Sequence, residues 1–288
     1  MLKNAVIIEQ KLGAIENLPT LPLVLRQIQK VLQNPRSNMA QIAMIVAKDQ
    51  ALASRTIRLV NSAFYAMRER VTSINHALVI LGLNTLNSLM IGLSVVKLFK
   101  NSSATGFDPE KFWEHCFGTA LLARSIGEIK GCKELDQIFS AGLLHDMGRL
   151  VLDQFLHDEF FKALVVAKDK KIPLFECEKA VLGFDHGEAG AWLGMKWGLP
   201  EIFNITMAFH HNQDFLPENL SGFAGDLKII SVADKLCNSS NIGNSGETVN
   251  VSKILCPVDG FTSKQTQEIV DKARADVKST IEEWNKAL

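Results

Sequence analysis

Hydrophobic side chains recur along this chain with the spacing of α-helices. In the first clear segment they repeat three and four positions apart, on one helical face made of Leu21, Val24, Leu25, Ile28, Val31 and Leu32. The same spacing continues through most of the sequence. Alternating runs of Val, Ile and Thr bounded by hairpin signals are absent. The pattern therefore predicts an all-α fold.

Short polar residues mark where several of these helices begin. N-caps are predicted at Ser37, Asp49, Asp108 and Asp185. Near the C-terminus, Thr262 and Gln265 have the spacing of a capping box. A helix is also predicted over residues 135–146. These signals place several polar side chains of the chain at defined positions on helices.

Two polar segments divide the chain. The first, NSSATG at 101–106, predicts a linker, and the second, at 238–250, predicts a loop. We therefore expect an N-terminal helical half (1–105), a second helical half (106–238) and a loop followed by a C-terminal amphipathic helix (239–288).

Residues 71–96 contain no Asp, Glu, Lys or Arg and are numerous enough to span a bilayer. They nevertheless include three Asn and a His, which are costly in lipid. A pair of helices buried in protein is the better interpretation, and no membrane association is predicted. The N-terminus also lacks the apolar region of a signal peptide.

Composition narrows the classes of function. Hydrophobic residues make up 47% and charged residues 22%, as in globular proteins. Lys and Arg together number 31, as do Asp and Glu, so bulk positive charge cannot drive nucleic-acid binding. The arginines between 55 and 70 leave a helix-turn-helix as a minor alternative. Five cysteines without a CxxC pair suggest reduced thiols and a cytoplasmic protein.

A pair of ionisable residues interrupts an apolar segment in the middle of the chain. The segment LLHDMGRL (143–150) places His145 and Asp146 at the end of a predicted buried helix. Buried polar side chains of this kind must be paired or must bind a metal. Alone, an HD dipeptide is a weak signal.

Other predicted helices carry five more such residues on or near their core-facing sides: His115, His186, His210, His211 and Asp234. A single core histidine is more often hydrogen-bonded than metal-bound, but the ordered set favours a metal. Imidazoles and carboxylates suit Mn, Fe, Zn or Mg better than Cu(I). Because helix neighbours point about 100° apart, His210 and His211 can serve two ions.

Several segments together carry a family resemblance: LPTLP (18–22), NSAFY (61–65), ILGL (80–83), AGLLHDMGRL (141–150), FDHGEAG (184–190) and WGLP (197–200). With them the chain resembles the HDOD family of bacterial signalling proteins. The order His, His-Asp, Asp is also similar to that of the HD phosphohydrolases. HDOD members often lack part of the metal-ligand set of these enzymes, whereas this sequence retains it.

The resemblance to the related HD-GYP phosphodiesterases implies seven metal ligands: His115, His145, Asp146, His186, His210, His211 and Asp234. It implies that Asp146 bridges two ions and that Arg149 pairs with a substrate phosphate. The Gly-Tyr-Pro signature after His211 is absent, and Arg149 replaces the usual Lys, which argues against cyclic di-GMP recognition. Lys111 replaces an acidic residue, which argues against a third metal.

The expected function follows from this resemblance. We predict a bacterial signal-transduction protein that holds one or two divalent ions, Fe or Mn first and Zn or Mg as alternatives. It would act mainly as a regulatory and binding module with a signalling protein partner. The alternative is a metal-dependent phosphohydrolase acting on a nucleotide or phosphodiester, with Asp146 and Arg149 as catalytic residues. An oxygen-using di-iron enzyme of the HD type is a lesser alternative.

Overall fold

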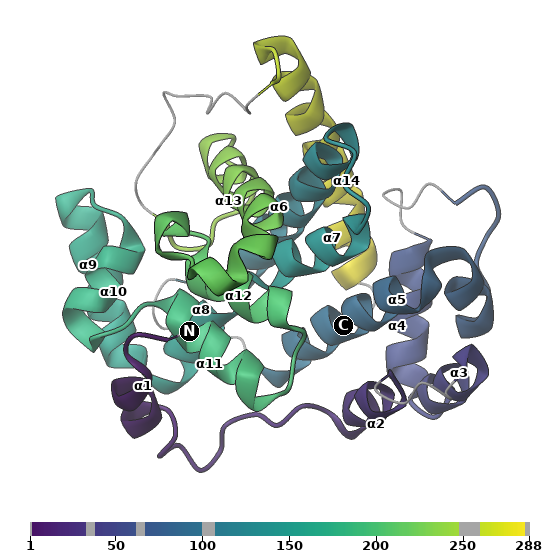
Figure 1. Cartoon of the computed structure of the whole chain (residues 1–288), viewed down its shortest axis with the longest axis horizontal. Coiled ribbons are helices and arrows are strands. Elements are labelled where there is room, and N and C mark those ends of the chain that lie inside the picture. Colours follow the sequence, from purple (N-terminus) through teal and green to yellow (C-terminus); the bar gives the residue numbers. More distant parts are fainter. Residues whose placement is uncertain (1, 33–37, 62–66, 100–106, 248–259, 286–288) are drawn as a thin grey trace. The chain divides into compact units, whose positions relative to one another are not determined.

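The structure, a computed structural model, describes residues 2–32, 38–61, 67–99, 107–247 and 260–285. Within these ranges every regular element is an α-helix or a short 3₁₀ helix, and no strand occurs (Figure 1). The predicted all-α fold is confirmed.

The helices belong to two units. Unit 1 consists of Met1–Leu18 and Phe99–Arg274, and unit 2 of Pro19–Leu98 and Ala275–Leu288. The first residues of the chain thus group with the second half of the sequence. The predicted linker at 101–106, and with it the predicted boundary at residue 105, lies outside the described residues.

Unit 2 is built from four helices and the end of the last helix of the chain: α2 (Leu23–Leu32), α3 (Met39–Ala47), α4 (Gln50–Val60), α5 (Ile74–Leu98) and α14 (Ser263–Asn285). As predicted, Asp49 caps α4, accepting a hydrogen bond from the Leu52 N–H at 2.9 Å. The cap of α3 is Asn38 rather than Ser37, and it forms a capping box with Gln41. Ser37 itself lies outside the described residues.

Helix α5 contains a sharp break. Gly82 has φ 76° and ψ 173°, a left-handed conformation that glycine adopts without a steric penalty. The break separates Ile74–Leu83 from Thr85–Ser94, which are bent by 112°. Among the described helices no single one is long and apolar enough to cross a membrane, and only this bent pair passes that test when taken together.

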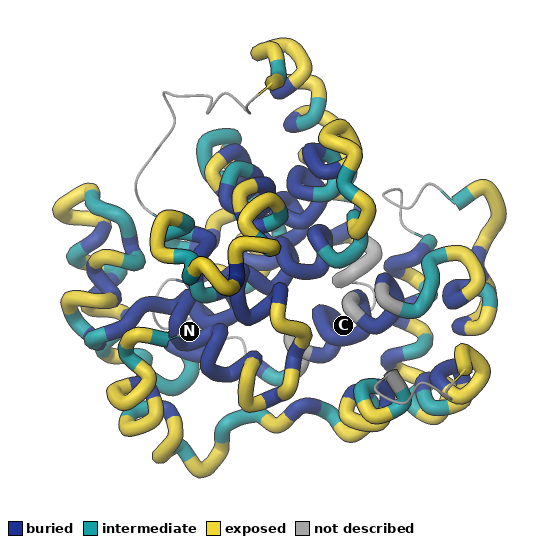
Figure 2. Tube along the Cα trace, viewed as in Figure 1, coloured by how far each residue is buried: buried dark blue, intermediate teal, exposed yellow. Residues whose placement is uncertain are grey.

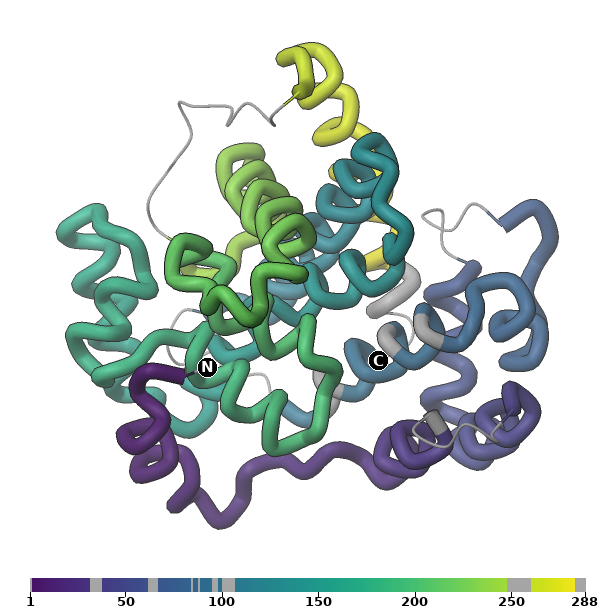
Figure 3. Tube along the Cα trace, in the orientation of Figure 1, coloured from purple at the N-terminus to yellow at the C-terminus, as the bar shows by residue number. Residues whose placement is uncertain are grey.

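Unit 1 holds the beginning of α14 and the remaining helices, which are α1 (Ala5–Lys11), α6 (Pro109–Ile129), α7 (Leu135–Leu144), α8 (Met147–Phe155), α9 (His157–Lys170), α10 (Leu174–Leu182), α11 (His186–Lys196), α12 (Glu201–Phe209), η2 (Gln213–Phe215), η3 (Glu218–Phe223) and α13 (Ala224–Ser239). Helix α13 lies beside α6 although the two are far apart in the sequence (Figures 1 and 3).

Two helices form the centre of unit 1. Helix α6 packs against α7 and α13, and α11 packs against α8 and α12. Both are buried on nearly all sides, unlike a surface helix with one apolar stripe (Figure 2). Polar side chains in the buried parts of these two helices, such as His115 and His186, therefore point into protein rather than into water.

Most of the predicted helix ends are confirmed, and two differ by one or two residues. Asp108 and Asp185 cap α6 and α11, and Thr262 and Gln265 exchange the hydrogen bonds of a capping box. The helix predicted over 135–146 ends earlier, at Leu144, because the chain turns at the HD dipeptide and restarts as α8. The loop predicted from residue 238 begins after Ser239, where α13 ends.

Helices α8 and α11 approach closely where both carry glycine. A Cβ atom on Gly148 would overlap the carbonyl oxygen of His186 and lie 2.7 Å from the backbone nitrogen of Gly190. A Cβ atom on Gly190 would lie 3.0 Å from the backbone nitrogen of Gly148. The absence of side chains at this crossing is what lets α8 come near the start of α11.

Replacing Gly148 by alanine is expected to destabilise unit 1 by about 3 kcal/mol, because the added methyl group must push two packed helices apart. Urea denaturation followed by circular dichroism measures this loss. The matched control is Gly225→Ala in α13, where an added Cβ meets nothing within 4 Å. It should change stability by at most about 1 kcal/mol. Equal midpoints for the Gly148 variant and the wild type would contradict the close crossing.

Candidate metal centre

The HD dipeptide forms the turn between α7 and α8. His145 is the C-cap of α7 and Asp146 the N-cap of α8, and both side chains are fully buried. The Nδ1 atom of His145 lies 2.6 Å from the carbonyl oxygen of Gly142. Since that oxygen can only accept, Nδ1 carries a proton and Nε2 is the ring nitrogen that faces the cluster. The turn therefore presents an imidazole nitrogen and a carboxylate side by side.

Helices α6 and α13 bring two further side chains to this turn. The Nε2 atom of His115 lies 3.4 Å from that of His145 and 3.1 Å from Oδ1 of Asp234. His145 Nε2 lies 3.7 Å from the same Asp234 oxygen. We call His115, His145 and Asp234 the His115 group.

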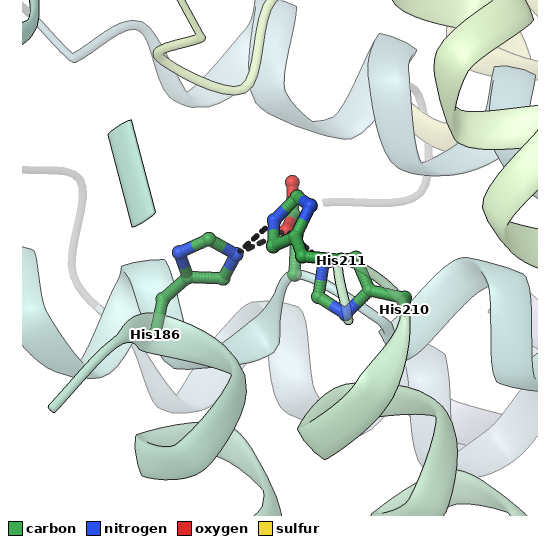
Figure 4. A group of neighbouring side chains, drawn as sticks. His186, His210 and His211 are labelled. Carbon is green, nitrogen blue, oxygen red and sulfur yellow. Dashed lines mark hydrogen bonds and ion pairs between the residues drawn. The ribbon is translucent and has the colours of Figure 1, made fainter. Parts of the chain in front are cut away.

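A second cluster of histidines lies on the other side of Asp146. His186 begins α11, while His210 and His211 follow α12, and their rings converge (Figure 4). The Nε2 atoms of His186 and His211 are 3.0 Å apart. Nδ1 of His210 donates to the carbonyl oxygen of Met207 at 2.9 Å, which leaves its Nε2 free. We call His186, His210 and His211 the His186 group.

Asp146 faces both groups at once. Its Oδ1 lies 3.1 Å from Nε2 of His186 and 3.5 Å from Nε2 of His210. Its Oδ2 lies 3.4 Å from Nε2 of His145 and 3.7 Å from Nε2 of His115. The structure thus brings all seven predicted ligand residues together, in two groups of donor atoms separated by one carboxylate.

The donor atoms of these groups fit a divalent cation. Both oxygens of Asp146 and Nε2 of His210 are buried without a hydrogen-bond partner, which is costly unless an ion satisfies them. Neighbouring donor atoms are 3.0–3.7 Å apart. Ligands bound about 2.1 Å from one ion are themselves separated by about 3.0–3.4 Å. The site is therefore close to the size that metal coordination requires.

The charges of the cluster also fit a divalent cation. Burial opposes ionisation of Asp146, but Arg149 and His145 outweigh it and hold the pKa of this carboxyl well below its usual range. Burial likewise disfavours the charged form of His145, yet the nearby Asp146 raises its pKa to about 10. Burial lowers the pKa of His210 and His211. Protons on histidine thus balance the carboxylates, and a bound metal would displace such protons.

Arg149 lies inside the protein beside this cluster. Its guanidinium donates to the backbone oxygen of Ser245 and, at 2.7 Å, to the Ser245 hydroxyl, and its Nε lies 3.4 Å from Oδ1 of Asp146. Only 1% of the residue is exposed. In this arrangement Arg149 stabilises Asp146 and fixes the segment at Ser245, and its Nη1 is already engaged.

Sequence reasoning missed Glu178, whose carboxylate accepts a hydrogen bond from Nδ1 of His186 at 2.6 Å. A signal was available, because Glu178 lies in the apolar stripe of α10 with Leu174, Cys177 and Leu182, all of them buried. A carboxylate in such a stripe needs a partner in the interior. Ser245 was missed as well, because it lies in a polar segment that carries no local sign of its role.

Comparison with known proteins identifies relatives of this chain by sequence. The HDOD domain family matches residues 18–213. An uncharacterised protein of Treponema pallidum (strain Nichols) is 28% identical over 205 residues, which is 71% of this chain. This chain spans only 39% of the length of that protein.

Two crystal structures are similar along nearly their whole length. An HDOD domain protein of unknown function from Geobacter sulfurreducens is 24% identical, with a TM-score of 0.78 and coverage of 96% of this chain and 97% of that one. A Shewanella amazonensis SB2B protein named as a candidate phosphohydrolase is 22% identical, with a TM-score of 0.70 and coverage of 98% of each chain. With the family match over most of its length, the chain belongs to the HDOD domain family.

Proposed function

We propose that unit 1 holds two divalent ions, one at each group of donor atoms, and that the protein hydrolyses a phosphoester within a signalling system. The observation that carries this proposal is the placement of Asp146, whose two oxygens face the two groups separately. When bound, a pair of ions supplies a water of lowered pKa and stabilises charge on a phosphoryl group.

The chain's own residues prepare this chemistry. Asp146 provides one oxygen to each group, and Arg149 beside it keeps the carboxylate ionised. The carbonyl oxygens of Gly142 and Met207 fix the protons of His145 and His210 on Nδ1, so that both Nε2 atoms point at the site as donors. Burial of most of these side chains excludes bulk water.

The number of donor atoms in each group affects which metal would suit a catalytic centre. The His186 group supplies three imidazoles and the His115 group two imidazoles with Asp234, and each also has one oxygen of Asp146. Four protein ligands complete a tetrahedral Zn²⁺, but leave positions for water and substrate on a six-coordinate Mn²⁺ or Fe²⁺ ion. This supports Mn or Fe for a catalytic centre. The naming of the Shewanella protein as a candidate phosphohydrolase supports a phosphoester, such as a nucleotide, as substrate.

A second candidate is a regulatory module whose metal is structural. The specific observation in its favour is Arg149, the residue expected to bind a substrate phosphate, which is instead engaged with Ser245 and Asp146. In that case signalling would depend on a protein partner that recognises the metal-bound form. The two candidate functions both predict a bound metal, but only the phosphohydrolase predicts turnover of a substrate.

Asp146→Ala is expected to remove both ions, since it takes one oxygen from each group. Elemental analysis of protein purified without oxygen and without added metal should find about two equivalents of Fe or Mn in the wild type and almost none in the variant. Asp146→Asn, which keeps the shape of the side chain, should also lose most of the metal. The matched control Asp158→Asn, on the exposed side of α9, should keep both ions.

Hydrolysis of bis(p-nitrophenyl) phosphate by the loaded wild type then separates the two candidates. Metal-dependent turnover that Asp146→Asn abolishes supports the phosphohydrolase. A fully loaded protein without turnover on this diester or on nucleotides supports the structural metal. Full metal occupancy in the Asp146 variants would refute the centre itself.

Arg149→Met is expected to destabilise the protein by about 3–5 kcal/mol, because it leaves Asp146 and Ser245 without their buried cationic partner. Chemical denaturation of metal-free protein measures the loss. Arg124→Met, at a half-buried ion pair with Asp136, is the control and should cost at most about 1 kcal/mol. Unchanged stability of Arg149→Met would show that the guanidinium is not held as described.

A further inference from the structure

Helix α10 presents two side chains to the His186 group. Phe175 and Glu178 are three positions apart, so they lie on the same face of the helix. Phe175 contacts the ring of His211, and Glu178 contacts His186. Neither residue is among the seven donors, and the proposed function assigns no role to the helix.

Glu178 holds His186 at two points with a single oxygen. Its Oε2 accepts from the backbone N–H of His186 at 2.8 Å and from the ring Nδ1 at 2.6 Å. Both side chains are fully buried. The ring is thereby fixed with Nε2 directed at Oδ1 of Asp146. In contrast, His145 and His210 are held by backbone carbonyls, which carry no net charge.

Phe175 orients the remaining ligand of the group. Its ring stacks on that of His211 with centroids 4.7 Å apart and planes inclined by 13°. His211 is partly exposed, whereas the other six residues are buried. A partly exposed imidazole is less confined by packing, so the stacked aromatic ring restricts where its Nε2 atom lies.

We propose that helix α10 is the positioning element of the His186 group, with Glu178 and Phe175 selectively setting the affinity for the ion bound there. This inference rests on the proposed metal centre. A carboxylate behind a ligating histidine fixes its tautomer and raises its basicity. Each group then has a carboxylate of its own besides Asp146: Asp234 as a direct donor, and Glu178 acting through His186.

The test is a titration of chelator-treated, full-length protein with Mn²⁺, which calorimetry and electron paramagnetic resonance monitor. Wild type should bind two ions, and their proximity should give the broadened signal of a coupled pair. Glu178→Gln should weaken one binding step about 10- to 100-fold and leave the other within about twofold. At one equivalent it should show the sharp hyperfine signal of an isolated ion, which general destabilisation of the fold would not produce.

Glu176→Gln is the matched control, since it makes the same change on the exposed side of the same helix. It should behave as wild type. Phe175→Leu is an independent variant that removes the stacking, and it should weaken the same step about 3- to 10-fold. If Glu178→Gln fails to fold, Phe175→Leu still tests the role of helix α10.

The outcomes separate this inference from the proposed function. Wild-type protein that binds no Mn²⁺ refutes the metal centre and the inference with it. Wild-type protein that binds two ions, with Glu178→Gln binding them equally well, overturns the role of α10 alone. Equal weakening of both steps would also overturn it, because Glu178 would then support the fold in general rather than one group.

Discussion

The buried charge of Asp146 is the constraint around which unit 1 is organised. Neither oxygen of this carboxylate has a hydrogen-bond partner, and a charge in that position is tolerated only beside compensating positive groups. Arg149 supplies one such group, and the histidines on both sides supply protons or, on the proposed function, hold a metal. Helices α6 and α11 and the residues that follow α7 and α12 accordingly bring histidines to this carboxylate.

Close packing of the backbones of α8 and α11 brings His186 near Asp146. Asp146 sits at the start of α8, where the helix dipole favours a negative charge. His186 sits at the start of α11, and the two helices can approach because Gly148 and Gly190 have no side chains at their crossing. The capping box of Asp185 and Glu188 fixes where α11 begins. Local helix signals and a steric gap together set the distance between Asp146 and His186.

The convergence of the seven predicted ligand residues could be anticipated because each is a polar side chain next to or within an apolar helical segment of the sequence. The turn at His145 and Asp146 could not, because the apolar pattern of 143–150 continues through it as if the helix did. Glu178 was overlooked among the charged neighbours Glu176 and Lys179, although its place in the apolar stripe distinguishes it. The bond from Arg149 to Ser245 joins residues 96 positions apart and has no local signature.

Ligands that come from distant helices reach the site in a fixed order during synthesis. A ribosome releases the chain from its N-terminus, so the His186 group is complete once His211 has emerged. His115 is made first but gains its neighbour Asp234 only when α13 follows. The residues of the two groups thus become available one group after the other. On the proposed function, the supply of metal at the moment of translation acts first on the half that contains His186.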